Sequence, residues 1–364
     1  MANSFFPSRT ITFYVAKMFL VRTFAILFAL VLVLQALDLL GVSDNILSYP
    51  GNGGAELWTY VSLRVPQIIS RFLPFSVLLG TLVTLTTLNQ NSEVVSMKAA
   101  GLSAHQVLAP LIVAAFGVAL ISFAFNDRIV TRANATLDRW EKAEFGPLPK
   151  DRKSALNIWV RDGPNLIHAT EVTGRGAATR LTGVTVYNRG SGALDSIVRS
   201  SVAQTIGGEW QLTDAERFDV ARGSMTKLGT IRVGAGIRPD QFTLATVDAD
   251  ELSFRALWNA IGDLKAAGRP TDALEAGLWH KISGPLSALL MPLLGAVAAF
   301  GIARSGRLFV RAVIGMALGF AYFVADNFGL AMGNLGAYPP LLAAWGPFFL
   351  FLLIGETVLI NTEE

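Results

Sequence analysis

Long runs of apolar residues dominate both ends of the chain. The first run covers residues 12–40, and its centre from Thr23 to Leu37 carries no charge. Five further runs, each about long enough to cross a bilayer, cover residues 65–88, 107–125, 286–303, 310–330 and 341–360. Runs of this length exceed the needs of an ordinary soluble core, so the pattern predicts six transmembrane helices.

The sequence between the third and fourth runs alternates like β-strands. Leu156, Ile158 and Val160 are separated by polar neighbours, and later pieces of strand length are bounded by Gly, Asn, Asp or Pro. Those pieces lie near 181–187, 194–204, 208–213, 216–221, 230–234 and 241–247. About eight short strands with turn signals between them predict a sandwich or jelly roll. From Asp250 onward the apolar spacing becomes helical.

These patterns divide the chain into four parts. Residues 1–126 hold transmembrane helices one to three, 127–250 form a β-jelly-roll domain, 251–281 form an amphipathic helical connection, and 282–364 hold helices four to six. The predicted fold class is a membrane α-helical protein with six transmembrane helices and an inserted all-β, jelly-roll-like domain.

A short amphipathic stretch, residues 90–106, separates the second run from the third. Asn91 or Ser92 is expected to cap a helix of about nine residues within 91–101, and a Ser103/Gln106 capping box to open the next helix. A helix this short needs a surface to dock on, either lipid or a partner protein. The residues expected to form the docking site are Ser92, Glu93, Val94, Val95, Met97, Lys98 and Gly101.

Composition supports a membrane protein with a water-soluble insert. The chain of 364 residues is 52% hydrophobic and 16% charged, and most of its charges fall between residues 127 and 281. The net charge of +3 is too small over this length to indicate nucleic-acid binding. The absence of cysteine from the sequence excludes disulfides, a thiol nucleophile and a Cys-ligated metal site.

The short loops predict the orientation in the membrane. The connections at 41–56 and 331–340 contain no Lys or Arg. The basic residues on the other side of the membrane are Arg9, Lys17, Arg22, Lys98, Arg304, Arg307 and Arg311. The positive-inside rule therefore puts both termini and residues 90–106 in the cytoplasm, and the β domain outside it.

No motif in the chain predicts catalysis. The sequence lacks a P-loop, a G-x-S-x-G elbow and an H-E-x-x-H motif, and its three histidines have no metal-ligand spacing. We therefore expect this chain to be neither an enzyme nor the holder of a cofactor or metal.

Charged residues in or near the apolar runs are candidates for a substrate cavity. They are Asp38, Arg64, Arg71, Arg132, Arg139 and Lys142. Guanidinium groups at the outer membrane face would suit the phosphates of an anionic amphiphile, although snorkelling into lipid headgroups explains them equally well. Asp326 and Glu356 are expected to find internal partners or to line a cavity.

Small residues at helical spacing predict close helix packing. The pairs are Gly315 with Gly319 and Gly329 with Gly333. We favour packing within this chain over a partner interface.

Several segments together resemble a known family. They are Val65-Pro66, Leu73–Gly80, Ser92–Ser103, Trp159–Gly163, Gly183–Tyr187, Trp279–Leu286 and Asp326–Gly329. The run S-E-x-x-x-M-x-A-x-G within Ser92–Gly101 carries most of the specificity. In these residues the chain resembles the LptF/LptG permeases (YjgP/YjgQ family) of the bacterial lipopolysaccharide transport complex.

The resemblance implies an ABC transporter permease of the bacterial inner membrane that works in outer-membrane biogenesis. Its six transmembrane helices would carry a periplasmic jelly roll after the third. Its partners would be a cytosolic ATPase dimer resembling LptB, which uses the ATP, a paralogous permease and a single-span protein resembling LptC. Residues 92–100 would be the coupling helix in the ATPase groove, with Glu93 as the ionic contact. The substrate would be lipopolysaccharide, extracted from the membrane and passed to a periplasmic bridge.

Two other functions remain open from the residues alone. The chain could be the permease of another lipid or lipoprotein-releasing ABC system. It could also be a non-transporting membrane protein whose β domain acts as a periplasmic scaffold.

Overall fold

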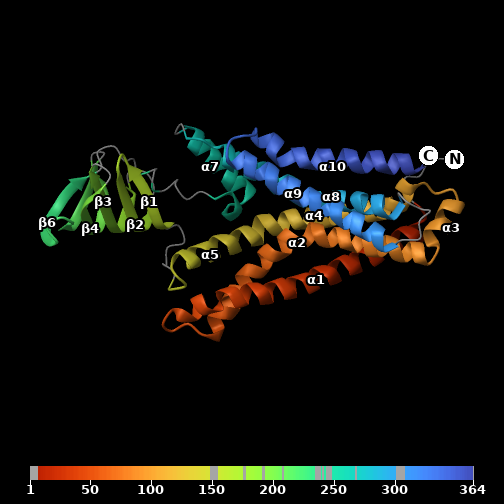
Figure 1. Ribbon diagram of the computed structural model, residues 1–364, viewed down its shortest axis with the longest axis horizontal. Helices are drawn as coiled ribbons and strands as arrows, with labels where there is room; N and C mark the ends of the chain where they lie inside the picture. The colour runs from red at the N-terminus through yellow and green to blue at the C-terminus, as the bar shows by residue number, and fades with distance from the viewer. Residues whose placement is uncertain are drawn as a thin grey trace. The chain divides into compact units, whose positions relative to one another are not determined.

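The computed structural model describes residues 7–147, 155–174, 178–190, 193–206, 209–233, 239, 242, 248–266, 269–300 and 308–363. The chain forms two compact units (Figure 1). The membrane unit comprises Met1–Ser43, Ala55–Ala135 and Ala249–Glu364, and the β unit comprises Asp44–Gly54 and Thr136–Asp248.

Each predicted apolar run lies in one long helix. The first three lie in α1 (Arg9–Ser48), α2 (Gly54–Gln90) and α4 (Ala104–Phe125), and the last three in α8 (Asp272–Phe300), α9 (Leu308–Asn334) and α10 (Pro340–Glu363). Residues 301–303 of the fourth run lie outside the described residues.

Five helical segments in the described part of the chain are long and apolar enough to cross a membrane. They are Arg9–Ser48, Gly54–Gln90, Ala104–Lys142, Val313–Asn334 and Pro340–Thr357. The helix α8 is not among them, and its first three turns hold the ionisable residues Asp272, Glu275, His280 and Lys281.

The core of the membrane unit is built mainly from α1, α2, α4 and α8. Fully buried side chains include Phe19, Leu85, Leu111 and Leu290, all 0% exposed. The helix α8 packs against α4, α9 and α10. Because lipid is as apolar as these side chains, close van der Waals contact rather than exclusion of water holds such helices together.

Glycines mark where these helices approach one another most closely. A Cβ atom on Gly319 of α9 would overlap Leu78 of α2, and one on Gly333 would lie 2.5 Å from the Cβ of Ala343 in α10. Gly315 is also buried. Packing within the chain, as predicted, therefore accounts for Gly319 and Gly333. The sequence reasoning missed Gly80 of α2, whose absent side chain leaves room for Thr23 of α1.

The connections around the third and fourth apolar runs are helical. The short helix α3 (Glu93–Ala99) joins α2 to α4, and α4 continues through a π-helical turn, η1 (Asn126–Val130), into α5 (Thr131–Lys142). A 3₁₀ turn, η3 (Ala249–Glu251), and the amphipathic helix α7 (Phe254–Ala266) precede α8. The predicted connection at 251–281 is thus helical for most of its length.

The described residues of the β unit form one antiparallel sheet in which six strands lie in chain order. The strands are β1 (Ala155–Asp162), β2 (Asn165–Thr173), β3 (Arg180–Gly190), β4 (Ala193–Ile206), β5 (Glu209–Asp219) and β6 (Ser224–Val233). Alternate residues such as Ile158, Ile167 and Val184 are at most 4% exposed and form one apolar face.

One detail of the predicted β domain differs from the structure. The pieces near 208–213 and 216–221 form a single strand, β5, because a register shift between Leu212 and Ala215 absorbs the turn-like residues. Asp214 there has a φ of 54°, as expected in a bulge. The strands of the described residues lie in chain order, as in a meander, and the jelly roll stays a prediction. Of the predicted strand at 241–247, only Phe242 lies within the described residues.

Candidate functional site

The short helix α3 is sharply bounded. At its C-terminal end Gly101 has a φ of +87°, its N–H donates to Lys98 O (2.9 Å), and Leu102 N–H donates to Met97 O (3.2 Å). These two bonds form a Schellman motif, which satisfies the last carbonyls of the helix and needs a left-handed residue at the position of Gly101. The predicted stop at Gly101 is confirmed.

The N-terminal end of α3 differs from the prediction. Ser92 occupies the N-cap position, but it adopts a left-handed conformation (φ 58°) and its side chain makes no capping hydrogen bond. The next helix has the predicted capping box, in which Gln106 N–H donates to Ser103 Oγ (3.2 Å) and Ser103 N–H donates to Gln106 Oε1 (3.0 Å).

The apolar residues of α3 divide between two faces. Val94 and Met97 are 3% and 9% exposed and pack into the core of the membrane unit, whereas Val95 is 64% exposed. The expectation that all three face a partner is therefore wrong for Val94 and Met97 in this fold, since positions three apart share the inward face of the helix. The outward face carries Ser92, Val95, Ser96 and Lys98.

Glu93 is held from two sides. Its Oε1 accepts hydrogen bonds from Asn91 Nδ2 (3.2 Å) and from the hydroxyl of Tyr14 (3.3 Å) in α1. The carboxylate is half-buried rather than fully exposed. It thus links the short helix to the start of the first transmembrane helix, a contact that no local sequence pattern indicated.

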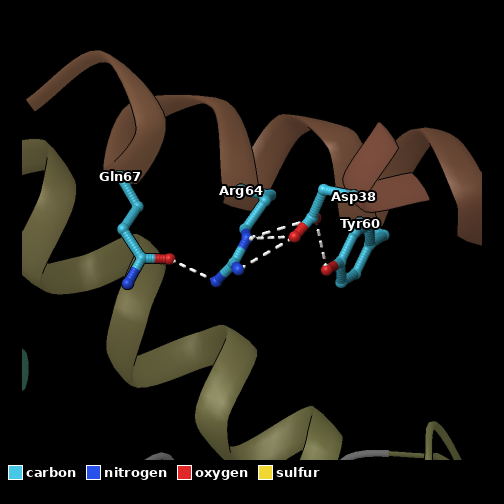
Figure 2. Close-up of polar contacts among 4 residues, drawn as sticks. All are labelled: Asp38, Tyr60, Arg64 and Gln67. Atoms are coloured by element: carbon cyan, nitrogen blue, oxygen red, sulfur yellow. Dashed lines mark hydrogen bonds and ion pairs between the residues drawn. The ribbon is translucent and has the colours of Figure 1, made fainter. Parts of the chain in front are cut away.

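The candidate cavity residues Asp38 and Arg64 form a network between α1 and α2 (Figure 2). The Arg64 guanidinium donates to Asp38 through three contacts of 2.9 to 3.2 Å, and its Nη1 also donates to Gln67 Oε1 (2.5 Å). The Tyr60 hydroxyl donates to Asp38 Oδ2 (2.7 Å). A carboxylate held by a guanidinium fork balances the Arg64 charge, so this cation is committed to the chain itself.

The remaining candidate cations lie apart from this network in sequence. Arg71 of α2 and Arg132 of α5 are exposed, Arg139 is half-buried, and Lys142 forms an ion pair with Asp138 one turn away. Exposed i,i+4 pairs contribute little stability, so Lys142 keeps much of its freedom to move.

The turn that precedes these cations was not predicted. At the π-helical η1, Ser70 donates to Asn126 Oδ1, and Asp127 Oδ1 accepts a hydrogen bond from Phe254 N at the start of α7. Asp127 thereby caps a helix more than a hundred residues further along the chain. The sequence feature that could have indicated this turn is the polar cluster Asn126-Asp127-Arg128 directly after the apolar run 107–125.

Both intramembrane acids have internal partners, as expected. Asp326 lies beside His280, with 3.0 Å between Oδ2 and Nε2, and Glu356 lies beside His105 at 3.3 Å. Among the described residues no cluster of three or more His, Cys, Asp or Glu could hold a metal ion.

Long apolar helices interrupted by an antiparallel β unit, with a short amphipathic helix between the second and third, define a multi-span membrane protein with an inserted β domain. The sequence profile of a family described as "Lipopolysaccharide export system permease LptF/LptG" matches residues 13–361. The chain belongs to this family.

Characterised relatives narrow the comparison to LptG. The lipopolysaccharide export system permease protein LptG of Escherichia coli strain K12 is 28% identical over 317 residues, which cover 85% of this chain and 86% of the relative. LptG of Haemophilus influenzae is 23% identical over 325 residues, covering 84% and 86%. The chain is thus an LptG-like permease for lipopolysaccharide transport, and the match favours neither alternative function.

Proposed function

We propose that this chain is the LptG-like half of a permease pair that extracts lipopolysaccharide from the bacterial inner membrane with energy from a separate ATPase. The single observation that carries the proposal is the arrangement of α3 on the membrane unit. Its polar-edged outer face bears Val95, its inner face is anchored in the membrane unit, and Glu93 ties it to α1. A displacement of α3 by the ATPase would therefore be transmitted directly to α1 through the contact between Glu93 and Tyr14.

The membrane topology of the proposal has six spans. Five described helical segments have suitable length and composition. We count α8 as the sixth span, because it packs among α4, α9 and α10. Its ionisable residues lie at or before Lys281, and the rest of the helix, up to Phe300, is apolar. The distribution of Lys and Arg in the short loops supports cytoplasmic termini and a periplasmic β unit.

The partners of the proposal follow from the family. They are a dimer of a cytosolic LptB-like ATPase, an LptF-like permease and a single-span LptC-like protein. ATP would be bound and hydrolysed in the ATPase, and this chain would need no cofactor, which agrees with the missing P-loop.

Of the six candidate residues for a substrate cavity, the proposal assigns only four to lipid binding. Arg71 and Arg132 are exposed and suit lipid phosphates, with Arg139 and Lys142 further along α5. Arg64 and Asp38 would instead shape the wall by fixing α1 to α2. Exposed apolar side chains of α1, among them Phe28 and Leu40 at 66% and 75% exposure, suit acyl chains or the surrounding lipid.

We further propose that the β unit has a jelly-roll-like closure over the apolar face of its sheet. Phe242 supports this closure, since it is 0% exposed and its ring lies edge-on to Trp210 of β5 at a centroid distance of 5.1 Å.

Charge reversal at Glu93 tests the proposed coupling. We expect Glu93→Lys to abolish lipopolysaccharide transport and co-purification of the ATPase while the protein still reaches the membrane. The matched control is Asp44→Lys, a charge reversal at an exposed acid near the other end of α1. A second variant, Tyr14→Phe, removes only the hydrogen bond to Glu93. Normal ATPase association and transport in Glu93→Lys would disprove the coupling role.

A further inference from the structure

The function described so far does not use α7, an amphipathic helix of the membrane unit. The helix packs against α8, and its buried apolar stripe is formed by Leu257, Ile261 and Leu264, which are 0%, 6% and 3% exposed. The adjacent Trp258 is 56% exposed, and its ring stacks with that of Phe254 at a centroid distance of 6.4 Å. The helix therefore carries an aromatic pair beside the face that it buries.

The start of α7 lies at the edge of the apolar zone of the membrane unit. The polar triplet Asn126-Asp127-Arg128 directly follows the apolar run 107–125, which indicates that this span leaves the hydrocarbon core there. Asp127 Oδ1 accepts a hydrogen bond from Phe254 N, the first residue of α7. Trp258 lies only about 6 Å further along the helix. Its indole is therefore close to the boundary between hydrocarbon and headgroups.

The end of α7 lies at nearly the same depth as its start. A Cβ atom on Gly277 of α8 would lie 2.5 Å from the Cβ of Ala249, shortly before α7. Glu275 of α8 forms an ion pair with Lys265 in the last turn of α7 (2.9 Å). Because Glu275 and Gly277 are only about 3 Å apart along α8, the segment 249–265 begins and ends at about one level. Such a segment runs along the membrane surface rather than away from it.

The two exposed flanks of α7 differ in chemistry. At about 100° per residue, Gly262 lies about 40° around the helix from Trp258, whereas Asp263 lies about 140° from it. Gly262 and Asp263 are both exposed and lie on opposite sides of the buried stripe. The aromatic pair thus occupies the flank of Gly262, and Asn259 and Asp263 form a polar ridge on the other side.

The aromatic flank fits a lipid surface better than a protein partner. Trp is enriched where hydrocarbon meets headgroups, because its ring is apolar and its N–H can donate to the headgroups. One exposed indole beside a half-buried phenyl ring offers far less area than the roughly 800 Å² per partner of a stable protein interface.

We propose that α7 is an interfacial anchor, which lies in the lipid headgroup region on the side of the membrane where the chain continues into the β unit. Trp258 and Phe254 insert into this region, while Asn259 and Asp263 face water. The anchor joins the end of the third span, through Asp127, to the start of α8, through Glu275.

The test uses spin labels on the two flanks of α7 in the full chain, reconstituted in nanodiscs of phosphatidylethanolamine and phosphatidylglycerol. The sequence contains no cysteine, so a nitroxide attaches only to an introduced one. The reporter is Gly262→Cys, where a Cβ atom meets open space, and the matched control is the exposed Asp263→Cys. The measurement is the rate of collision with oxygen, which concentrates in lipid, and with a nickel chelate, which stays in water.

We expect the ratio of oxygen to chelate collisions to be several-fold higher at residue 262 than at residue 263. Equal ratios would show that both flanks face water and would overturn the proposal. Exclusion of both reagents from residue 262 would show that protein covers this flank, which would overturn it as well.

A second pair of variants tests whether Trp258 holds the helix in the lipid. In the Gly262→Cys chain, Trp258→Ala should lower the ratio at residue 262 toward that at residue 263. The control Trp58→Ala removes another exposed indole, 75% exposed near the start of α2, and should leave the ratio unchanged. An unchanged ratio in Trp258→Ala would refute the anchoring role of Trp258.

Discussion

Removing Asp38 and Arg64 singly and together tests whether Arg64 serves the fold or the lipid. The three guanidinium contacts to Asp38 and the Tyr60 bond predict that Asp38→Ala and Arg64→Ala each destabilise the membrane unit. In either single variant the surviving ionised group loses its compensating charge.

The magnitude follows from the geometry and the exposure of the pair. Charge-assisted hydrogen bonds are worth about 1.5 to 3 kcal/mol when well shielded, but these side chains are 31% and 21% exposed. We therefore expect each single variant to lower the free energy of unfolding by about 2 kcal/mol, with a coupling energy of about 1 to 3 kcal/mol. The double variant should then be little worse than either single one.

The assay is a double-mutant cycle on the purified protein, unfolded by titrating sodium dodecyl sulfate into mild detergent micelles and followed by circular dichroism. Lipopolysaccharide retained by the assembled complex is measured in parallel, with Arg71→Ala as a comparison at an exposed arginine. Additive losses of stability in the cycle, together with a loss of lipid retention specific to Arg64→Ala, would refute the conclusion that Arg64 is committed to Asp38.

Three further predictions follow from other contacts. Val95 is 64% exposed, so Val95→Asp should weaken ATPase co-purification with little change in stability. Met97 is 9% exposed, so Met97→Ala should lower the free energy of unfolding by about 2 to 4 kcal/mol. Equal stability of the two variants would contradict the assignment of Val95 to the outer face of α3 and Met97 to its inner face. Gly319→Leu should prevent stable packing of α9 against α2, measured as loss of monodisperse protein in size-exclusion chromatography, since even a Cβ overlaps Leu78; a normal elution profile would argue against that close approach. Partial burial alone would raise the pKa of Glu275, but hydrogen bonds from the Thr271 hydroxyl and the Lys265 ammonium outweigh burial and hold this pKa below its usual value of 4.5. The Lys265–Glu275 ion pair should therefore stabilise the fold above about pH 4.5. It should lose that effect as the pH falls through the lowered pKa. The small stability difference between wild type and Glu275→Gln, measured at pH 7 and again below pH 4, should therefore shrink in acid, and an increase would reverse the assigned sign.

Periodicity and turn chemistry predicted the elements whose causes are local. The described parts of the six apolar runs all lie in long helices because twenty or so apolar residues have one stable backbone conformation in lipid. Gly101 and the Ser103/Gln106 box were readable because each cap involves residues within a few positions of one another. Alternation similarly predicted β1, β3 and β4, but it did not indicate β2, and it split β5, which crosses a bulge, at Asp214.

Tertiary structure alone decided which partner each polar residue meets and which side of α3 faces outward. Composition shows that Val94, Val95 and Met97 are apolar, but only the packing of α3 on the membrane unit buries two and exposes one. Arg64 looked like a cation for lipid until the fold put Asp38, 26 positions away, against its guanidinium. Pairings such as Tyr14 with Glu93 and His280 with Asp326 depend on how whole helices dock, and no sequence spacing encodes that distance.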